Sequence, residues 1–422
     1  MCTKGVHRQG LQHKDGTGLP LSCKRLPKGR VRAGPACSVR KRTRLQPALN
    51  HHKPSQPAGL HIALIVADDA QGSGVLMSHM VPSLARSLAA FGHGVHVICP
   101  EVDPSQTSGV YEELRGGLTV RRLVLADGHP APSAQALWRQ ALGHAHLAHT
   151  FASKGLANPT ASPDWTTSLA PLVPVVLSML DMPAGDDAAW QAGLDAAALV
   201  LVPSRTLLVR LADRFRLDAN RTRIQEPGLF HGYPQGLSRA RSWNGEGPLR
   251  ILHLGPRTPE SGIEELIAAL DRLPQDRVQL CCFGPRGPEG RAGDLARMSH
   301  RVPMAMAGRL ESGALARVAS TCHVAALPGM DPGAYPFALE EALALGLPVM
   351  ACESGSALER YGAGPIQILP PGDVEAWAVA FLGHLENPSG LQCAQAAVPD
   401  RIPCAQSAAE SLAELYRHAL LA

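Results

Sequence analysis

The sequence predicts an α/β fold built from two doubly wound parallel sheets in series. Short apolar runs recur along the chain, each followed by a loop and an amphipathic stretch, which is typical of buried parallel strands with crossover helices. The alternation breaks once, at residues 232–248, where four Gly and two Pro occur without periodicity. A length of 422 residues, about two to three times that of one domain, fits two such halves.

The first 58 residues differ from the rest of the chain in composition and in the lack of a regular apolar spacing. They are rich in Gly, Pro, Lys, Arg and His without an apolar period, so we expect a disordered basic extension at 1–58. Three interpretations remain open: an unstructured extension or early start codon, a basic tail for acidic lipids or nucleic acid, and a mitochondrial-type presequence. The first 60 residues carry thirteen Lys or Arg against one acid, Asp15, a charge of +12. Since the whole chain carries +4, the other 362 residues carry −8, which excludes a basic nucleic-acid-binding domain there.

The first predicted domain covers residues 59–235. It begins with the apolar run LHIALIVA at residues 60–67, followed by the loop DDAQGSG, the helical stretch HMVPSLARSLAAFG and the strand GHGVHVICP. Later strands are expected in LTVRRLVL, VPVVLSMLD and AAALVLVPS, with a helix in RTLLVRLADRF. Right-handed crossovers place the loops after these strands along one edge, where ligands bind in such folds.

The second predicted domain, residues 249–390, alternates more clearly. Its strands are predicted in LRILHLG, VQLCCFG, VPMAMAG, HVAALP, LPVMAC and IQILPP. Its helices are predicted in IEELIAALDRL, GDLARMS, ALARVAS, FALEEALALG and VEAWAVAFLGHL. We expect an interdomain linker at 236–248 and a C-terminal helix at 405–422 that returns to the fold.

The composition excludes several classes of protein. Hydrophobic residues make up 45% and charged residues 18%, as in an ordinary globular chain, and 4% aromatics argue against nucleic-acid stacking platforms. The ten cysteines include no CxxC pair, so neither a zinc ribbon nor a redox dithiol is indicated, and most lie in apolar runs as small buried residues of a reducing compartment. No run of eighteen apolar residues and no secretory apolar region occurs. We therefore expect a cytoplasmic protein, with peripheral contact at the inner face of a membrane left open.

Several strings follow the order found in one enzyme family. They include LARSLAAFGHGVHVICP, then ILHLGPRTPESGIEELIAAL, and finally EALALGLPVMACESGSALE with LPPGDVEAWA. From about residue 60 the chain resembles the retaining glycosyltransferases of family 4. The resemblance implies the GT-B fold, in which two Rossmann-like domains face a cleft. It also implies a hexosyltransferase-like activity that moves a sugar from a nucleotide diphosphate sugar to an acceptor on the N-terminal domain. That acceptor would be a glycan, a lipid or a small molecule, and no metal or other cofactor is expected.

A nucleotide sugar carries a diphosphate, which favours backbone N–H groups at a helix N-terminus, basic side chains, and a carboxylate for the ribose hydroxyls. The helix predicted from Phe337 follows the loop GMDPGAYP, so we expect phosphate on the amides of Phe337, Ala338 and Leu339. Glu341 matches the second Glu of the family's E-x7-E motif, which implies a ribose-binding role. The alternative for Glu341 is a solvated helix-face charge like its neighbour Glu340.

The segment after the strand LRILHLG departs from the family's G-R-L-x-x-x-K-G pattern. Gly255 and Gly262 fit, whereas Pro256 stands at the Arg position and Ser261 at the Lys position. Arg257 lies one residue out of register and is our candidate for a replacement cation, the alternative being an ordinary surface Arg. Such cations neutralise the leaving diphosphate, and losing one donor of this kind typically lowers the rate about 100- to 1,000-fold.

Two further positions also lack the family's residue. Gly333 stands where the family has the first Glu of E-x7-E, with Asp331 two residues earlier, and Leu180 stands where a His is frequent. These replacements leave a second hypothesis open, that of a catalytically impaired GT-B protein which binds a nucleotide sugar or a partner transferase.

The first domain offers two weaker signals. Gly72 and Gly74 form a G-x-G loop after the first strand, which would let backbone approach a phosphate or acceptor, although a plain strand-to-helix turn explains it equally. The string HAHLAHT holds His144, His146 and His149, and the first two resemble the family's H-x-H strand end at the cleft. Ordinary strand or loop histidines, or a metal site, are the alternatives, and the i, i+2, i+5 spacing disfavours the metal.

Overall fold

The computed structural model describes part of the chain, and the account below concerns only that part: residues 59–66, 80–103, 105–126, 132–152, 161–229, 242–284, 301–308, 310, 312–329, 335–352, 355–400 and 402–421. Several sequence predictions lie outside these residues. They are the basic extension 1–58, the loop with Gly72 and Gly74, the helix in GDLARMS, and the positions Asp331 and Gly333.

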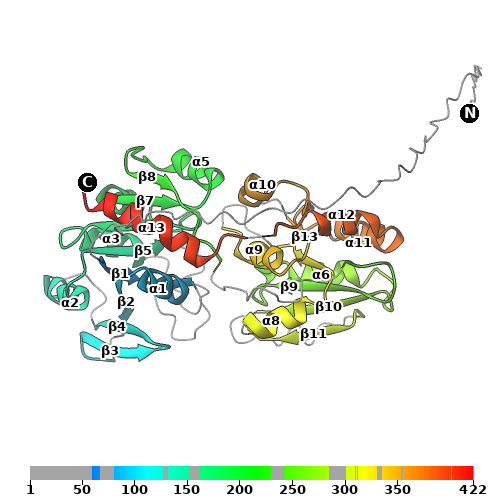
Figure 1. Ribbon diagram of the computed structural model, residues 1–422, viewed down its shortest axis with the longest axis horizontal. Coiled ribbons are helices and arrows are strands. Elements are labelled where there is room, and N and C mark those ends of the chain that lie inside the picture. Colours follow the sequence, from blue (N-terminus) through cyan, green and yellow to red (C-terminus); the bar gives the residue numbers. More distant parts are fainter. Residues whose placement is uncertain are drawn as a thin grey trace, which may run out of the picture. The chain divides into compact units, whose positions relative to one another are not determined.

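The N-terminal half forms an eight-stranded sheet in the order β3-β4-β2-β1-β5-β6-β7-β8 (Figure 1). All neighbouring strands pair in parallel except β3 with β4. Strands β5, β6 and β7 are buried along their whole length and are mostly apolar, as expected for a sheet covered on both faces. The strands are β1 (His61–Ile65), β2 (Gly94–Val102), β3 (Gly109–Arg115), β4 (Leu118–Leu125), β5 (Leu147–Ala152), β6 (Val175–Met179), β7 (Leu199–Val202) and β8 (Thr222–Ile224).

The antiparallel edge strand β3 was not predicted. It runs back along β4 through a two-residue turn at Gly116 and Gly117, whose φ values are +57° and +81°. Positive φ at both central residues is the requirement of a tight hairpin turn, which glycine meets without strain. The glycine pair that ends the segment GVYEELRGG is therefore the sequence signal for this hairpin.

The second sheet has six strands, all parallel, in the order β11-β10-β9-β12-β13-β14. The central strand β9 pairs with β10 on one side and β12 on the other. Strand order reverses at β9, so the carboxyl ends of β9 and β12 mark the point where ligands bind in doubly wound sheets. The strands are β9 (Leu249–Leu254), β10 (Val278–Phe283), β11 (Met304–Ala307), β12 (Val324–Leu327), β13 (Val349–Ala351) and β14 (Ile366–Ile368).

Helices connect the strands of both sheets. Those of the first half are α1 (Val81–Ala90), α2 (Pro132–Leu142), α3 (Ala161–Leu169), α4 (Asp187–Ala196) and α5 (Arg205–Arg214). Those of the second half are the 3-10 turn η2 (Pro259–Ser261), α6 (Ile263–Leu270), α8 (Ser312–Ala319), α9 (Phe337–Ala344), α10 (Gly355–Tyr361), α11 (Val374–Glu386) and α12 (Ser389–Ala396).

The last helix, α13 (Ala405–Ala419), belongs to the core of the first sheet although it ends the chain. Its buried residues Leu412 and Tyr416 share a hydrophobic cluster with Leu84 and Leu88 of α1. This confirms the predicted return of the C-terminal helix, whose apolar period needs a partner surface to be buried.

The chain passes between the two halves at two neighbouring points. Leu229 and Cys404 pair in parallel, with the Leu229 amide donating to Pro403 and the Ala405 amide donating to Leu229. Trp243, inside the predicted linker, is buried in the core beside β9. The domain boundaries read from the sequence stay predictions.

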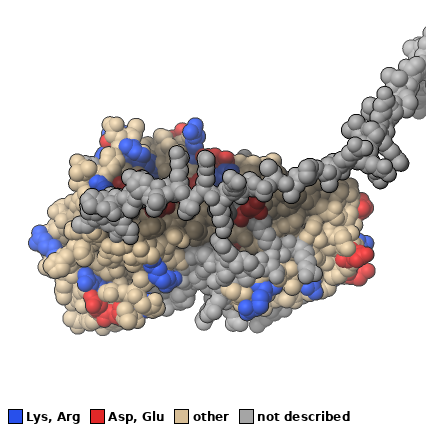
Figure 2. Space-filling view, in the orientation of Figure 1, with Lys and Arg blue, Asp and Glu red and all other residues tan. Residues whose placement is uncertain are grey.

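The side chains of the described residues agree with the composition argument. The side chains of Cys99, Cys281, Cys282, Cys322 and Cys352 are buried. On the face shown in Figure 2, basic and acidic side chains are scattered over a surface of mostly other residues. In the described part of the chain, no helix has the length and apolar character needed to span a bilayer, and no three His, Cys, Asp or Glu side chains cluster as metal ligands would.

Candidate functional site

The loop after β9 forms the floor of the candidate donor site. β9 ends at Leu254, and the chain turns through Gly255 and η2 to Gly262, the N-cap residue of α6, whose φ is +68°. A left-handed residue at a helix start favours glycine, because a Cβ is strained there. The N-terminus of α6 thus points its first amides toward the carboxyl edge of the sheet.

Glycines let the loops after β9, β10 and β12 touch through their backbones. A Cβ on Gly284 would lie 1.8 Å from the Gly255 carbonyl oxygen, and one on Gly329 would lie 2.0 Å from the Ser261 carbonyl carbon. A Cβ on Gly262 would lie 2.7 Å from the Gly329 amide nitrogen. These contacts leave no room for larger residues and hold the three strand ends in one rigid cradle.

The two positions that lack the family's cations take other roles. Pro256 is exposed, and the Ser261 hydroxyl donates to the Thr258 carbonyl at 2.7 Å. Ser261 therefore stabilises the η2 turn. Neither residue brings positive charge to the loop.

Arg257 is buried, with 9% of its surface exposed, and its Nη2 donates to the Ala307 carbonyl at 3.3 Å. Ala307 ends β11, the edge strand two places from β9, whereas α9 packs against β12 and β13 on the other side of β9. The interpretation as an ordinary surface Arg is wrong, because this side chain is buried. The structure does not bring Arg257 next to Glu341, and its role as a replacement cation stays a prediction.

His253 is a buried residue of this site that the sequence analysis missed. It lies two residues before Gly255 on β9, with 2% of its surface exposed, and its Nδ1 bonds to the Ala326 carbonyl oxygen at 2.9 Å. A carbonyl only accepts, so Nδ1 carries the hydrogen and Nε2 carries the lone pair. No described residue bonds to Nε2. Burial lowers the pKa of His253 to about 4. A histidine inside the apolar run LRILHLG was the available signal.

The start of α9 differs from the expected phosphate cradle. The Phe337 amide donates to the Tyr335 carbonyl at 2.9 Å, so this predicted phosphate ligand is already bonded within the chain. The Tyr335 amide in turn donates to the carbonyl of Leu180, at the end of β6. Proline at 336 forces the tight turn that directs the Phe337 amide backward. For Ala338 and Leu339, the phosphate-binding role stays a prediction.

Glu340 is not the solvated helix charge that the sequence suggested. It is fully buried, accepts from the hydroxyls of Tyr335 at 2.8 Å and Tyr361 at 2.9 Å, and pairs with Arg360. Arg360 also pairs with Glu226, after β8, at 2.5 Å. Burial outweighs the Arg360 charge and raises the pKa of Glu340 to about 7. The helix period explains the difference, since Glu340 lies on the inward face of α9.

Glu341 is half-buried on the next position of α9. It lies on a different face of the helix from Glu340, about 100° away. Its predicted ribose-binding role is compatible with α9 packing on β12 and β13, the strands beside the loop of Gly255.

His146 does not lie where its predicted role needs it. It immediately precedes β5, so it sits at the amino end of the strand, the edge opposite to ligand-binding loops. Its Nδ1 accepts from the His61 amide at 3.1 Å, and His61 begins β1. The comparison with a cleft H-x-H strand end is therefore wrong for His146, because the strand starts after the motif instead of ending with it.

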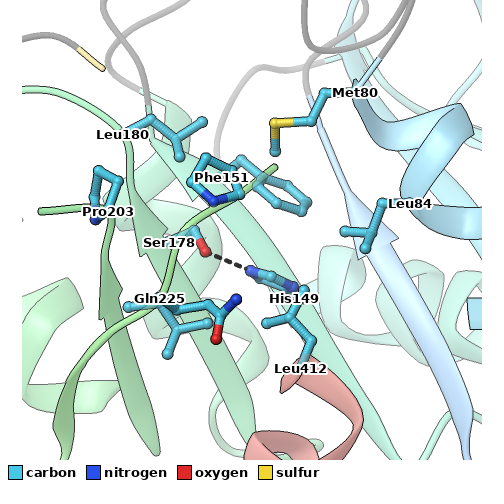
Figure 3. A pocket seen from close by; sticks show the side chains of 11 residues that line it. Met80, Leu84, His149, Phe151, Ser178, Leu180, Pro203, Gln225 and Leu412 are labelled. Carbon is cyan, nitrogen blue, oxygen red and sulfur yellow. Dashed lines mark hydrogen bonds between the residues drawn. The ribbon is translucent and has the colours of Figure 1, made fainter. Parts of the chain in front are cut away.

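The third histidine of that string, His149, lies inside β5 near a small cavity (Figure 3). Its ring nitrogens bond to the Tyr416 hydroxyl and the Ser178 hydroxyl, each at 2.7 Å. Burial lowers the pKa of His149 to about 3. Phe151 stacks on the imidazole, with 4.2 Å between the ring centroids, and Leu180 lines the same cavity (Figure 3). The cavity measures about 10 Å³, about what one water needs, so it does not hold a sugar.

A larger cavity of about 340 Å³ lies at the other edge of the second sheet. Pro348 and Ile366 line it where β13 and β14 begin, and His384 bonds to Gln367 there at 2.8 Å. The amino ends of the strands are opposite to the loop of Gly255, so this cavity is separate from the candidate donor site.

Comparisons with known proteins agree with this architecture. Residues 248–387 match the model of the family described as Glycosyl transferases group 1. Glycogen synthase of Mycobacterium tuberculosis is 26% identical over 382 residues, which cover 80% of this chain and 89% of that protein. Sucrose-phosphate synthase from Thermosynechococcus elongatus superposes with a TM-score of 0.63 at 20% identity, covering 85% of this chain and 98% of the other.

A third relative was solved with a nucleotide sugar. The Anabaena protein Alr3699/HepE in complex with UDP-glucose superposes with a TM-score of 0.64 at 16% identity, covering 85% of this chain and 100% of that chain. Two parallel sheets with a returning C-terminal helix are the GT-B arrangement. The chain therefore has the GT-B fold, and its residues 248–387 match the family described as Glycosyl transferases group 1.

Proposed function

We propose that this protein is a glycosyltransferase whose sugar donor is a nucleotide diphosphate sugar. The observation that carries the proposal is the glycine-built loop from Gly255 to Gly262, which leads into α6 inside the segment that matches the family. Amides at a helix N-terminus favour phosphate through their hydrogens and the helix dipole. The donor class is supported by the neighbour HepE, which was solved with UDP-glucose.

In this proposal Glu341 binds the ribose hydroxyls, and Gly255, Ser261 and the Ala338 and Leu339 amides surround the diphosphate. The acceptor is held by the N-terminal half, at the carboxyl edge of its sheet. Transfer with retention of configuration and without a metal follows from the resemblance to family 4.

A panel of UDP-, GDP- and ADP-sugars tests the proposal through donor hydrolysis and transfer to glycan, lipid and small-molecule acceptors. Glu341→Ala should lower kcat/KM about 10- to 100-fold, as expected for losing hydrogen bonds to a charged group. Glu410→Ala, at an exposed position of α13, is the matched control and should match the wild type. Equal activity of Glu341→Ala and the control would remove Glu341 from the site. Arg257→Ala tests the predicted replacement cation in the same assay.

The second candidate is a GT-B protein that binds a nucleotide sugar or a partner transferase without turnover. It is favoured by Pro256 and Ser261, which bring no positive charge, and by Arg257, which bonds to β11. Calorimetric titration with UDP-glucose separates the candidates, because binding without hydrolysis or transfer supports the second one. Absence of both binding and turnover across the panel would contradict the donor site in both candidates and would leave only the binding of a partner transferase.

A further inference from the structure

His253 combines two properties that a buried structural histidine does not need. It lies directly under the loop of the candidate donor site, and its Nε2 is left without a partner in the described structure. A buried polar atom without a hydrogen bond costs about 1–3 kcal/mol, so the chain would gain stability from any residue that satisfied it. A buried polar atom without a partner needs an explanation, and a ligand that supplies the missing partner is one.

The geometry directs Nε2 toward the space above Gly255. A Cβ placed on Gly255 would lie 3.3 Å from Nε2 and 3.8 Å from the Cβ of Ser261. The absent side chain of Gly255 therefore leaves a gap bounded by the imidazole on one side and Ser261 on the other. The gap lies at the turn leading to the N-terminus of α6, where the proposed function places the diphosphate. Nε2 is closed to solvent there, so this turn has to shift for a phosphate oxygen to reach it.

A diphosphate bound at this loop favours a cation, and the two positions at which the family carries Arg and Lys do not provide one. Pro256 and Ser261 are uncharged, and Arg257 donates to Ala307 on the far side of β10. A neutral His253 cannot donate from Nε2, because its one ring hydrogen is held by the Ala326 carbonyl. An imidazolium would keep that bond and donate a second one to an anionic oxygen.

We propose that His253 is the cation of the phosphate site, taking up a proton from solvent on Nε2 when a nucleoside diphosphate group binds over Gly255. This inference rests on the proposed donor site. In the complex the Nε2 hydrogen is donated to a phosphate oxygen and the Nδ1 hydrogen stays on Ala326. The proton returns to solvent when the nucleotide leaves, so no covalent bond between heavy atoms changes.

The surroundings of His253 make its charge depend on the ligand. Cys282 is its register partner on β10, and Cys352 follows β13 in the same apolar cluster. Burial raises the pKa of these thiols to about 12 and about 11, so both stay neutral. Glu265 of α6 acts electrostatically on Cys352, and Arg257 acts on Cys282. Burial keeps the imidazole neutral in the empty site, and a phosphate within hydrogen-bonding distance stabilises the charged form.

The test is calorimetric titration of the full chain with UDP-glucose, whose diphosphate diester does not itself titrate near neutral pH. Binding is measured at pH 7 in two buffers of low and high ionisation enthalpy, so that the difference in heat gives the protons exchanged. The wild type should take up close to one proton per nucleotide, and its affinity should fall as pH rises from 6 to 8.5. His253→Asn should take up none and bind at least tenfold more weakly, with affinity independent of pH.

A second variant, Gly255→Ala, tests the same contact in case His253→Asn does not fold. Gly255→Ala places a methyl group 3.3 Å from Nε2, in contact with a side chain and not with backbone, and Gly255 has no positive φ. Thermal unfolding should show a folded protein, and proton uptake should be lost together with affinity.

The outcomes separate this inference from the donor-site proposal. If the wild type and His253→Asn bind UDP-glucose equally and without proton uptake, the role of His253 is overturned and the donor site stands. Wild-type uptake and affinity in Gly255→Ala would likewise overturn it. If no nucleotide sugar binds to the wild type at all, the donor site falls and this inference with it.

Discussion

Two buried histidines, one in each sheet, show how differently the same side chain is used in this molecule. His149 on β5 is 1% exposed, and His253 on β9 is 2% exposed. Burial lowers the pKa of both, to about 3 and about 4. His149 nevertheless bonds through both ring nitrogens, to Ser178 and Tyr416, whereas His253 bonds only through Nδ1.

The comparison shows that burial and a shifted pKa are not sufficient to identify a functional histidine. His149 joins β5, β6 and α13, three parts of the chain that are far apart in sequence, and its hydrogen-bonding capacity is exhausted. It therefore stabilises the fold and the return of the C-terminal helix. His253 keeps one atom unbonded beside a loop built from glycines, so it retains the capacity to bind a ligand.

Replacing the two histidines should lower the free energy of unfolding by different amounts, and the loss at His149 should be the largest of the effects predicted here. His149→Leu leaves the hydroxyls of Ser178 and Tyr416 without their partner, and the loss should be about 2–5 kcal/mol of unfolding free energy. His253→Leu removes one hydrogen bond and no second partner, so it should cost about 1 kcal/mol. Urea unfolding of the two variants measures the difference. Equal losses would contradict the distinction between a saturated and an unsaturated site.

Both histidines should make the folded state less stable at acidic pH. In each case the folded pKa lies below the unfolded value of about 6.5, so the unfolded state binds more protons and stability falls as pH drops below 6.5. Between pH 6.5 and 4 each histidine should account for a loss of about 3 kcal/mol.

This acid effect is measured as a difference between proteins. Glu340 acts in the opposite direction, because its raised pKa makes the folded state bind the proton more tightly between about pH 4.5 and 7. Unfolding free energies of the wild type, His149→Leu and His253→Leu are therefore compared at each pH. Each variant should show a shallower decline than the wild type, and a decline of unchanged slope would show that the histidine is not buried neutral.

The smallest expected effect concerns the hydroxyl of Tyr416. Tyr416→Phe keeps the packing of the ring against α1 and removes one hydrogen bond to His149, so it should cost about 1–2 kcal/mol. Tyr111→Phe, on the exposed edge strand β3, is the control and should lie within about 0.5 kcal/mol of the wild type. Chemical unfolding followed by circular dichroism reports both values. A Tyr416→Phe protein as stable as the control would mean that His149 finds another partner.

Much of the fold was predictable because the spacing of apolar residues within a short segment already indicates a strand or a helix. The runs around Ile62, Leu252 and Val349 are apolar on both faces, and each forms a parallel strand as expected. The hairpin at Gly116 was also encoded locally, in a GG pair, although it was overlooked. Contacts between distant segments were not predictable, such as the bond between the Tyr335 amide and the Leu180 carbonyl.

The loop of the candidate site was predictable from the sequence, whereas the contacts of the side chains around it were less so. The loop of Gly255 and Gly262 was identified from the sequence, since glycine spacing reflects backbone geometry. The roles of side chains depend on which strand lies beside which, and this explains the errors. Glu340 faces inward to Arg360, and His146 precedes its strand instead of ending it. The role of Arg257, which reaches β11, stays a prediction.

By itself the sequence determined two α/β halves, a returning helix and a glycine loop at the carboxyl edge of the second sheet, because periodicity and glycine content act over a few residues. Only the tertiary structure decided which buried polar groups are bonded. Hydrogen bonds of His149, Glu340 and His253 join residues that are from 5 to 267 positions apart in the chain. Whether every polar atom of these side chains has a partner depends on how the sheets and helices pack. That packing gives His149 two partners and leaves Nε2 of His253 without one in the described structure.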